Sequence, residues 1–330
     1  MEKYQNLVEE YKNKIDNANN IIVMAHINPD GDAIGSCLAL KNILENEGKN
    51  VVVCLNDIPE SFDILNGFED IYSYEELKMK MDYIKKFDLA IILDLSEKDR
   101  LDTRIEYLEK SIDSILIDHH VGGSRFCNLN IIDSESPATC QIIYEIYEKL
   151  GDINKVLKYE VMLPLITGII TDTGGFRFIN TNVKTFEIAI EAKKLGINFD
   201  YIYNEVIFKK SISQFKLEQE AIKNLKFYSE DKIAITYLNN EIEGYSERKP
   251  GEISGIVNMA KNIDTVEISV FLNEVESESY KVSMRSKEKD ISKIAKYFAG
   301  GGHILAAGCT IKGSLQEVTD KLLEKLNEII

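Results

Sequence analysis

The feature that most constrains the fold is a series of short, continuous apolar runs in the first half of the chain, separated by stretches with helical periodicity. Runs of Val, Ile and Leu without polar alternation are typical of strands that are covered on both faces, as in parallel sheets. The predicted strands are 21–25, 51–55, 89–93 and 114–117, and the predicted helices are 2–19, 33–47, 74–86, 138–150, 154–170 and 183–195. Alternation of this kind builds βαβ units, so this half should form an α/β domain.

The last third of the chain follows a different pattern. Segments 232–238, 265–271 and 279–285 alternate polar with apolar residues, which is typical of strands in a half-exposed, partly antiparallel sheet. Residues 197–225 are polar and helix-like, without strong strand signals. We therefore expect a second, smaller α/β domain with a mixed sheet.

The length of 330 residues is enough for about two domains, each with its own core. The predicted domains are an N-terminal domain with a mostly parallel sheet and flanking helices over residues 1–190, a helical connector over 191–225, and the smaller C-terminal domain over 226–330.

The charge of the chain limits its partners. The 39 Lys and Arg residues are outnumbered by 55 Asp and Glu residues, which gives a formal net charge of −16. Non-specific binding to long nucleic acid depends on Lys and Arg side chains that neutralise many phosphates. An anionic substrate should therefore be short, and cations should offset the carboxylates that surround it.

The five cysteines are an odd number, and none of them forms a C-x-x-C pair. A disulfide framework or a thiolate zinc site is therefore not expected. The chain also lacks a run of about 18–20 apolar residues and the apolar core of a signal peptide. We expect a cytoplasmic protein with reduced thiols and no membrane partner.

Acidic and histidine residues follow the predicted strands at the point where each strand ends. These residues are His26, Asp30 and Asp32 after the first strand, Asp94 after 89–93, Asp118, His119 and His120 after 114–117, and Asp172 after the apolar run 161–170. Because the carboxyl ends of parallel strands share one edge of a sheet, we expect these side chains to converge there.

Imidazole nitrogens and several carboxylate oxygens, without thiolates, suit a divalent ion of the manganese or magnesium type. So many like charges cannot stay ionised side by side unless cations lie among them, and their number indicates two ions. Two ions a few ångströms apart polarise phosphate oxygens, hold a bridging water as hydroxide and stabilise a leaving oxygen. The residues therefore predict hydrolysis of a phosphoester or a phosphoanhydride.

These motifs resemble those of the DHH phosphoesterase superfamily. The resemblance consists of H-x-N-P-D-G-D-A at 26–33, the single Asp94, D-H-H at 118–120, T-D-T-G around Asp172, and G-G-G-H-I-L-A-A-G at 300–308. The last motif is similar to the hallmark of DHHA1 domains. The resemblance covers essentially the whole chain and is closest to the NrnA-type group, the bifunctional oligoribonucleases and PAP phosphatases.

The resemblance implies a set of metal ligands. One ion would be held by His26, Asp30 and Asp94, and the other by Asp32, Asp94, His119 and Asp172. Asp94 would bridge the ions and count among the catalytic residues together with Asp118 and His120. Asp118 would orient the histidines. His120 would face the substrate phosphate and protonate the leaving oxygen. The expected ions are two Mn²⁺, with Mg²⁺ or Co²⁺ as alternatives.

The resemblance also implies that the second domain binds substrate. The S-x-R-S motif contributes Ser283, Arg285 and Ser286, and the glycine-rich motif contributes Gly300, Gly301, Gly302 and His303. The guanidinium of Arg285 suits phosphate, and a glycine run lets backbone amides approach a ligand. Two questions stay open. The glycine run either binds substrate or is only a flexible turn after helix 291–298, and Arg177 contacts either phosphate or an acidic neighbour.

The resemblance implies hydrolysis of short oligoribonucleotides (nanoRNA), including linear dinucleotides such as pApA, to mononucleotides by attack of a hydroxide held by two metal ions. A nucleotide 3′,5′-bisphosphate, 3′-phosphoadenosine 5′-phosphate (PAP), would give AMP. The alternatives are a manganese-dependent inorganic pyrophosphatase, a RecJ-like exonuclease for single strands, and a nucleotide-binding sensor without activity. Besides its substrates, the chain has a second copy of itself, in a homodimer, as a candidate partner.

Overall fold

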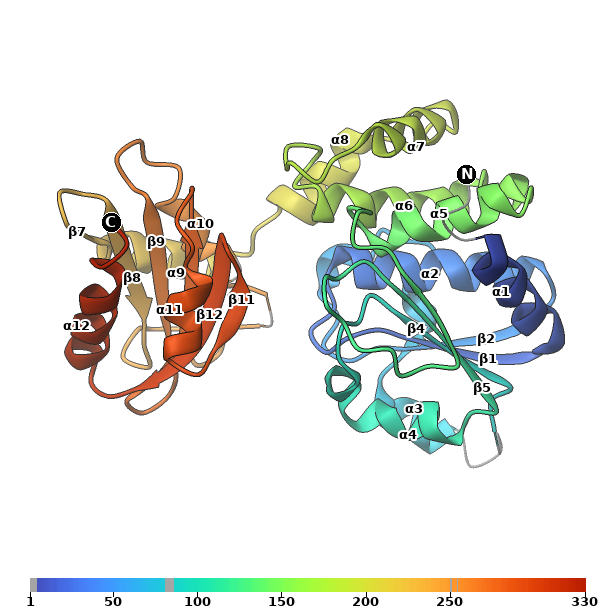
Figure 1. Cartoon of the computed structure of the whole chain (residues 1–330), viewed down its shortest axis with the longest axis horizontal. Coiled ribbons are helices and arrows are strands. Elements are labelled where there is room, and N and C mark those ends of the chain that lie inside the picture. The colour runs from blue at the N-terminus through green and yellow to red at the C-terminus, as the bar shows by residue number, and fades with distance from the viewer. Residues whose placement is uncertain (1–4, 81–85, 250, 254) are drawn as a thin grey trace. The chain divides into compact units, whose positions relative to one another are not determined.

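The computed structural model describes residues 5–80, 86–249, 251–253 and 255–330 (Figure 1). Contacts between residues divide the chain into two compact units, with the boundary between Lys209 and Lys210. This boundary lies inside the range expected for the connector, 191–225, and the three expected domain ranges stay a prediction. Among the described residues, no helix combines the length and the apolar character needed to cross a bilayer.

The first unit is built on a six-stranded sheet whose neighbouring strands are all parallel. Its strands are β1 (Asn20–Met24), β2 (Asn50–Cys54), β3 (Ile71–Tyr72), β4 (Leu89–Leu93), β5 (Asp113–Asp118) and β6 (Leu129–Ile132). The predicted parallel sheet is confirmed. The sequence did not predict β3 and β6, because two to four residues give too short an apolar run to be distinguished from a loop.

Helices cover both faces of this sheet (Figure 1). The helices of this unit are α1 (Gln5–Asn17), α2 (Gly31–Asn46), α3 (Tyr74–Lys80), α4 (Ile105–Lys110), α5 (Thr139–Lys149), α6 (Tyr159–Asp172), α7 (Val183–Lys194) and α8 (Phe199–Ile202). Helices α7 and α8 lie beyond α6, on the side away from the sheet (Figure 1). Alternate strand residues point to opposite faces. Ile21 and Val23 of β1 pack in the core formed with α1, α2, α5 and α6, whereas Ile22 and Met24 pack in the core formed with α3 and α4.

One expected helix begins later than predicted, and another is only partly described. Helix α6 begins at Tyr159 rather than at residue 154, because Lys158 has an extended backbone and only a 3₁₀ turn, η5 (Ile153–Lys155), precedes it. Residues 81–85 of the helix expected over 74–86 lie outside the described residues. The described residues also form the short helical segments η1 (Glu60–Phe62), η2 (Phe68–Asp70), η4 (Lys98–Arg104) and the π-helix η6 (Tyr203–Phe208).

The second unit contains a mixed six-stranded sheet in the order β11-β12-β10-β9-β8-β7. Its strands are β7 (Lys226–Tyr228), β8 (Ile233–Leu238), β9 (Ile268–Glu276), β10 (Ser279–Ser286), β11 (Gly301–His303) and β12 (Ala306–Lys312), and its helices are α9 (Ile212–Lys223), α10 (Ile256–Met259), α11 (Ser292–Tyr297) and α12 (Leu315–Leu326). Among the strands that the structure describes here, β8 and β9 pair in parallel and the other neighbours are antiparallel. The predicted mixed sheet is confirmed.

Candidate metal centre

The predicted site residues lie where the strand order of the first sheet changes direction. The order β3-β2-β1-β4-β5-β6 places β1 and β4 side by side, although β2 and β3 lie between them in the sequence. The chain leaves these two neighbours in opposite directions across the sheet, so the loops at their carboxyl ends separate and leave a crevice. His26 follows β1 and Asp94 follows β4.

The carboxylate of Asp94 is the centre of this cluster. Its Oδ2 lies 3.4 Å from Nε2 of His26, and its Oδ1 lies 3.3 Å from Nε2 of His119. Asp30 approaches the first imidazole, with 3.9 Å between its Oδ1 and Nε2 of His26. Asp94 therefore presents one oxygen to each of two separate groups, which is the arrangement that a bridging carboxylate needs.

The second imidazole has two further carboxylate neighbours. Nε2 of His119 lies 3.4 Å from Oδ2 of Asp172 and 3.8 Å from Oδ2 of Asp32. The ligand atoms of His26, Asp30 and Asp94 lie within 4.8 Å of one another, as do those of Asp32, His119 and Asp172. The structure thus brings the six residues together around Asp94, and their binding of metal stays a prediction.

Local hydrogen bonds orient several of these side chains. Nδ1 of His26 lies 2.7 Å from the carbonyl oxygen of Ile27, and a carbonyl only accepts, so Nδ1 donates its proton there and Nε2 is the nitrogen that faces Asp94. Asp30 is the N-cap of α2 and accepts hydrogen bonds from the backbone amides of Asp32 and Ala33. The sequence of this loop therefore fixes both a helix start and a ligand geometry.

The carboxylates of the cluster need positive charge beside them. Burial and the charge of Asp94 raise the pKa of Asp32 to about 7. Burial and its carboxylate neighbours raise the pKa of Asp172 well above its usual value. Burial opposes the charged form of Asp94, but His119 and His26 hold the pKa of this carboxyl well below its usual range. Burial alone would lower the pKa of His119, but Asp94 and Asp32 raise it to about 10.

Asp172 shows the same need for a cation from its place in the fold. It is the last residue of α6, where the helix dipole carries partial negative charge. A carboxylate at this end of a helix is unfavourable unless positive charge lies beside it. The donor set of imidazole nitrogen and carboxylate oxygen, without a thiolate, fits hard or borderline divalent ions.

His120 has a different environment from the other histidines. Its Nδ1 lies 2.7 Å from Oδ1 of Asp118, which is fully buried, and 3.6 Å from Oδ1 of Asp94. Asp94, His119 and His120 form a third group of atoms close enough to hold an ion. Because Nδ1 donates its proton to the closer oxygen of Asp118, Nε2 is the nitrogen left for another partner.

Sequence reasoning missed the residues that brace the site. The loop after β4 reaches the loop after β1, where the amide of Ile27 donates to the carbonyl of Arg100 over 3.0 Å. Arg104, in the same segment, is fully buried and donates to the carbonyls of Leu101 and Cys54. An arginine in a polar sequence segment gives no signal of burial, so these contacts were not predictable.

The turn after Asp172 was also missed. Gly174, Gly175 and Phe176 have consecutive left-handed backbones, with φ values of 56°, 72° and 64°. A Cβ on Gly175 would lie 2.9 Å from the ring of Tyr203, so glycine is needed there for both conformation and space. Arg177 donates from Nε to the carbonyl of Gly174 over 2.7 Å and so closes this turn.

The second unit places three of the expected substrate residues on one face of its sheet. Ser283 and Arg285 alternate with the core residues of β10, and the register pairs Arg285 with Ala306, which in turn pairs with His303. Directly paired residues share a face. Arg285 and His303 thus lie in one row, with Cα atoms roughly 10 Å apart across the small Ala306.

The glycine-rich motif forms a strand rather than the flexible turn of the alternative interpretation. A Cβ on Gly300 would lie 2.2 Å from the carbonyl oxygen of Gly308, and one on Gly302 would lie 2.5 Å from Cα of Ala307. These glycines therefore let β11 approach β12 closely. Ser286 is buried and accepts a hydrogen bond from the amide of Lys289. Substrate binding by these residues stays a prediction.

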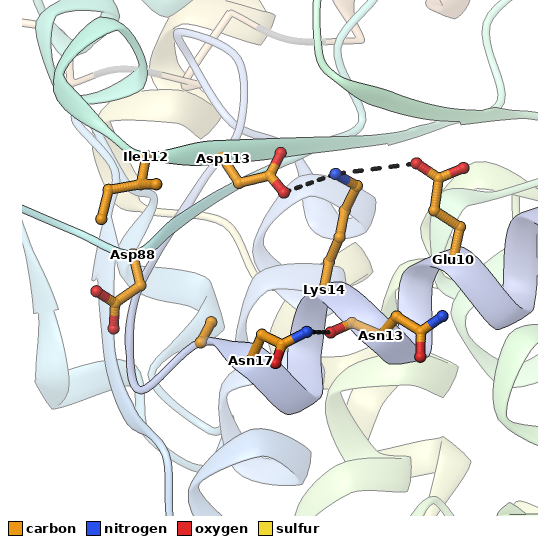
Figure 2. Close-up of a pocket in the computed structure, with 8 residues that line it drawn as sticks. Glu10, Asn13, Lys14, Asn17, Asp88, Ile112 and Asp113 are labelled. Carbon is orange, nitrogen blue, oxygen red and sulfur yellow. Dashed lines mark hydrogen bonds and ion pairs between the residues drawn. The ribbon is translucent and has the colours of Figure 1, made fainter.

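A surface hollow of about 400 Å³ lies at the opposite, amino edge of the first sheet (Figure 2). Lys14 of α1 pairs with Asp113, with 2.6 Å between Nζ and Oδ2, and approaches Glu10. Asp88 accepts hydrogen bonds from the amides of Asn19 and Asn20. Because these charges are satisfied, the hollow ties α1 to the sheet and offers no reactive group.

Comparison with known proteins matches both units to families. Residues 20–169 match the N-terminal domain of the DHH family, and residues 230–330 match the DHHA1 domain. The bifunctional oligoribonuclease and PAP phosphatase NrnA of Thermus thermophilus is 30% identical over 310 residues, which cover 93% of this chain and 89% of that protein. The protein with the same name from Bacillus subtilis is 26% identical, covering 88% and 89%.

A solved structure extends this similarity to the whole fold. The crystal structure of an exopolyphosphatase-related protein from Bacteroides fragilis superposes with a TM-score of 0.90 at 29% identity, covering 98% of this chain and 96% of that chain. Both units therefore have folds already seen in related proteins.

The charge of the cluster leads to a prediction on stability. Mn²⁺ at a hundred times its dissociation constant should stabilise the fold by about 2.7 kcal/mol. This free energy corresponds to a rise of roughly 5–10 °C in melting temperature for a unit of this size. Asp94→Asn should remove most of the rise. Asp152→Asn, which alters a half-buried carboxylate that pairs with Lys155 far from the strand ends of the site, is the matched control and should keep the rise. An equal response of the two variants would contradict a centre built around Asp94.

Proposed function

Because the chain belongs to the DHH family and carries a DHHA1 domain C-terminal to its DHH domain in the sequence, we propose that it is a phosphoesterase that hydrolyses short oligoribonucleotides, such as pApA, to mononucleotides. The same site would remove the 3′-phosphate of PAP to give AMP, the second activity in the names of its relatives. The observation that carries the proposal is the convergence of six histidine and aspartate side chains from four separate segments.

Two divalent ions would occupy the centre. His26, Asp30 and Asp94 would hold one of them, and Asp32, Asp94, His119 and Asp172 the other. When bound, such ions polarise phosphate oxygens, lower the pKa of water and stabilise developing negative charge. Imidazole ligands favour a transition metal, so Mn²⁺ is preferred here over Mg²⁺, with Co²⁺ as a further candidate.

The pair formed by Asp118 and His120 would supply the proton for the leaving group. Asp118 accepts the Nδ1 proton of His120, which fixes the orientation of the ring and leaves Nε2 for the substrate. A proton carried on Nε2 would pass to the ribose oxygen as its bond to phosphorus breaks. Both the cleavage of a dinucleotide and the removal of a 3′-phosphate expel a ribose oxygen, so one acid serves both reactions.

The second unit would recognise the rest of the substrate. Arg285 offers a planar, permanently charged fork for a phosphate, and the exposed His303 in the same row offers a donor or a stacking face. Ser283, on the same face, adds a hydroxyl. A short substrate needs few such contacts, which agrees with a net charge of −16.

The alternative functions have weaker support. A manganese-dependent pyrophosphatase would share the DHH motifs but not the DHHA1 domain that matches residues 230–330. A RecJ-like enzyme for long single strands should carry an extended basic surface, which the acidic composition argues against. A sensor without activity should lack part of the ligand set, whereas all six residues are present and lie together.

The function is tested with the purified chain, Mn²⁺ and three substrates at equal concentration: pApA, PAP and inorganic pyrophosphate. We expect AMP from pApA and from PAP, and little phosphate from pyrophosphate. A series of 5′-phosphorylated oligonucleotides of two to about ten residues should show a steep fall of kcat/KM with length. Cleavage of pyrophosphate alone, or a flat profile with length, would contradict the proposal.

The role of His120 gives a sharper prediction. His120→Gln should lower kcat by about 10²–10⁴-fold, the usual contribution of a general acid, while Mn²⁺ binding stays close to that of the parent. Asp118→Asn should lower kcat less, because the imidazole stays in the site but loses the carboxylate that orients its ring. Loss of Mn²⁺ from His120→Gln would instead make this histidine a metal ligand.

We further propose that the chain works in the cytoplasm, where the free cysteines stay reduced.

We also propose that two copies of the chain associate. Support for association comes from α7, which exposes Val183, Phe186 and Ile190 along one side. Exposed apolar residues at helical spacing are typical of a surface that is covered in an assembly. Sedimentation velocity of Phe186→Lys beside the parent chain tests it, and a monomeric parent would contradict it.

A further inference from the structure

We infer that Thr139, the first residue of α5, is a positioning residue that holds Asp32 and Asp94 in place and thereby sets the affinity for one of the two ions. The inference rests on the metal centre of the proposed function. Thr139 belongs to none of the motifs that resemble the family, and it lies in the sequence S-P-A-T-C, which gives no chemical signal.

The first observation is a pair of backbone hydrogen bonds. The amide of Thr139 donates to Oδ2 of Asp32 over 2.6 Å, and the amide of Cys140 donates to Oδ1 over 2.9 Å. Both oxygens of a fully buried carboxylate are therefore fixed by the start of one helix. Bonds of this kind fix where the remaining lone pairs of Asp32 point.

The second observation explains why α5 accepts this partner. The N-cap of α5 is Ala138, whose side chain cannot cap the free amides of the first turn. Asp32, 107 residues earlier in the chain, takes the place of a capping side chain. The positive end of the helix dipole also favours the carboxylate charge. The start of α5 thus depends on Asp32, and the orientation of Asp32 depends on α5.

The third observation joins a second ligand to the same residue. Oγ1 of Thr139 donates to Oδ1 of Asp94 over 3.4 Å, and both side chains are buried. Oδ1 is the oxygen that faces His119, whereas Oδ2 faces His26. Thr139 therefore contacts Asp32 and Asp94, which are both expected ligands of the ion bound by His119. Its contacts do not include His26 and Asp30, which are expected to bind the other ion alone.

Close packing keeps this arrangement from relaxing. A Cβ on Gly168 of α6 would lie 2.4 Å from Sγ of Cys140 and 3.0 Å from Cα of Asp32. Sγ of Cys140 also lies 3.6 Å from the carbonyl oxygen of Asp32. The start of α2 and the side chain of Cys140 thus pack against α6 at a distance that only glycine permits, which limits how far Asp32 can move from the amides of α5.

The experiment measures Mn²⁺ binding to apo-protein, with the electron paramagnetic resonance signal of free Mn²⁺ as the readout. Thr139→Val replaces the hydroxyl by a methyl group of similar shape, and Thr139→Ser keeps the hydroxyl. We expect one of the two dissociation constants to rise about 10–100-fold in Thr139→Val, as usual for the loss of a group that supports a ligand. The other constant should change less than threefold, and Thr139→Ser should resemble the parent.

A third variant tests the backbone part of the inference. Thr139→Pro removes the amide proton as well as the hydroxyl, and proline is well tolerated at the first position of a helix after an extended residue such as Ala138. The site weakened in Thr139→Pro should lose more affinity for Mn²⁺ than the same site in Thr139→Val. Circular dichroism melts of the apo-proteins identify any variant that does not fold. If Thr139→Pro does not fold, the comparison of Thr139→Val with Thr139→Ser still tests the inference.

Two results would overturn the inference. If Thr139→Val binds two Mn²⁺ with both constants within twofold of the parent, Thr139 has no positioning role, although the proposed function stands. If Thr139→Ser loses as much affinity as Thr139→Val, the hydroxyl is not responsible. A parent chain that binds no Mn²⁺ would overturn the proposed centre together with the inference, so the two failures are distinguishable.

Discussion

The structure of the first unit depends on a single buried carboxylate, that of Asp94, which faces an imidazole on each side. At 1% exposure this group has almost no contact with water, so protein groups must stabilise its charge. His26 and His119 do so, and each of them brings further carboxylates close to Asp94. Carboxylates gathered in this way stay buried and ionised only when positive charge balances them. The geometry of the cluster therefore agrees with the expected binding of metal ions.

The topology of the sheet explains how residues so distant in sequence reach Asp94. When the crossover helices of two adjacent parallel strands lie on opposite faces of a sheet, the loops at the carboxyl ends of these strands diverge and leave a crevice. β1 and β4 are such a pair, so the segments that follow them meet without any helix between them. The starts of α2 and α5 then close the crevice from one face, and α6 contributes Asp172 from its end.

The sequence predicted what depends on local pattern. Continuous apolar runs identified β1, β2, β4 and β5, and the acidic residues at three of their ends identified the site. Contacts made across long sequence separations were missed. Thr139 caps nothing locally, and its partner Asp32 lies 107 residues away. The glycines from Gly300 to Gly302 were compatible with a turn, because their pairing with β12 depends on close approach between backbones.

Local charge, rather than net charge, resolves how so acidic a chain can attract a phosphate. Four carboxylates, those of Asp30, Asp32, Asp94 and Asp172, bring about four negative charges to the crevice, and two divalent ions would balance them. The starts of α2 and α5 each add about half a positive charge, and the end of α6 takes about half of one away. The ions would therefore leave the centre close to neutral, although the chain as a whole is acidic. Such a centre would admit a single phosphate group at short range, while the remaining acidic surface disfavours a long polyanion.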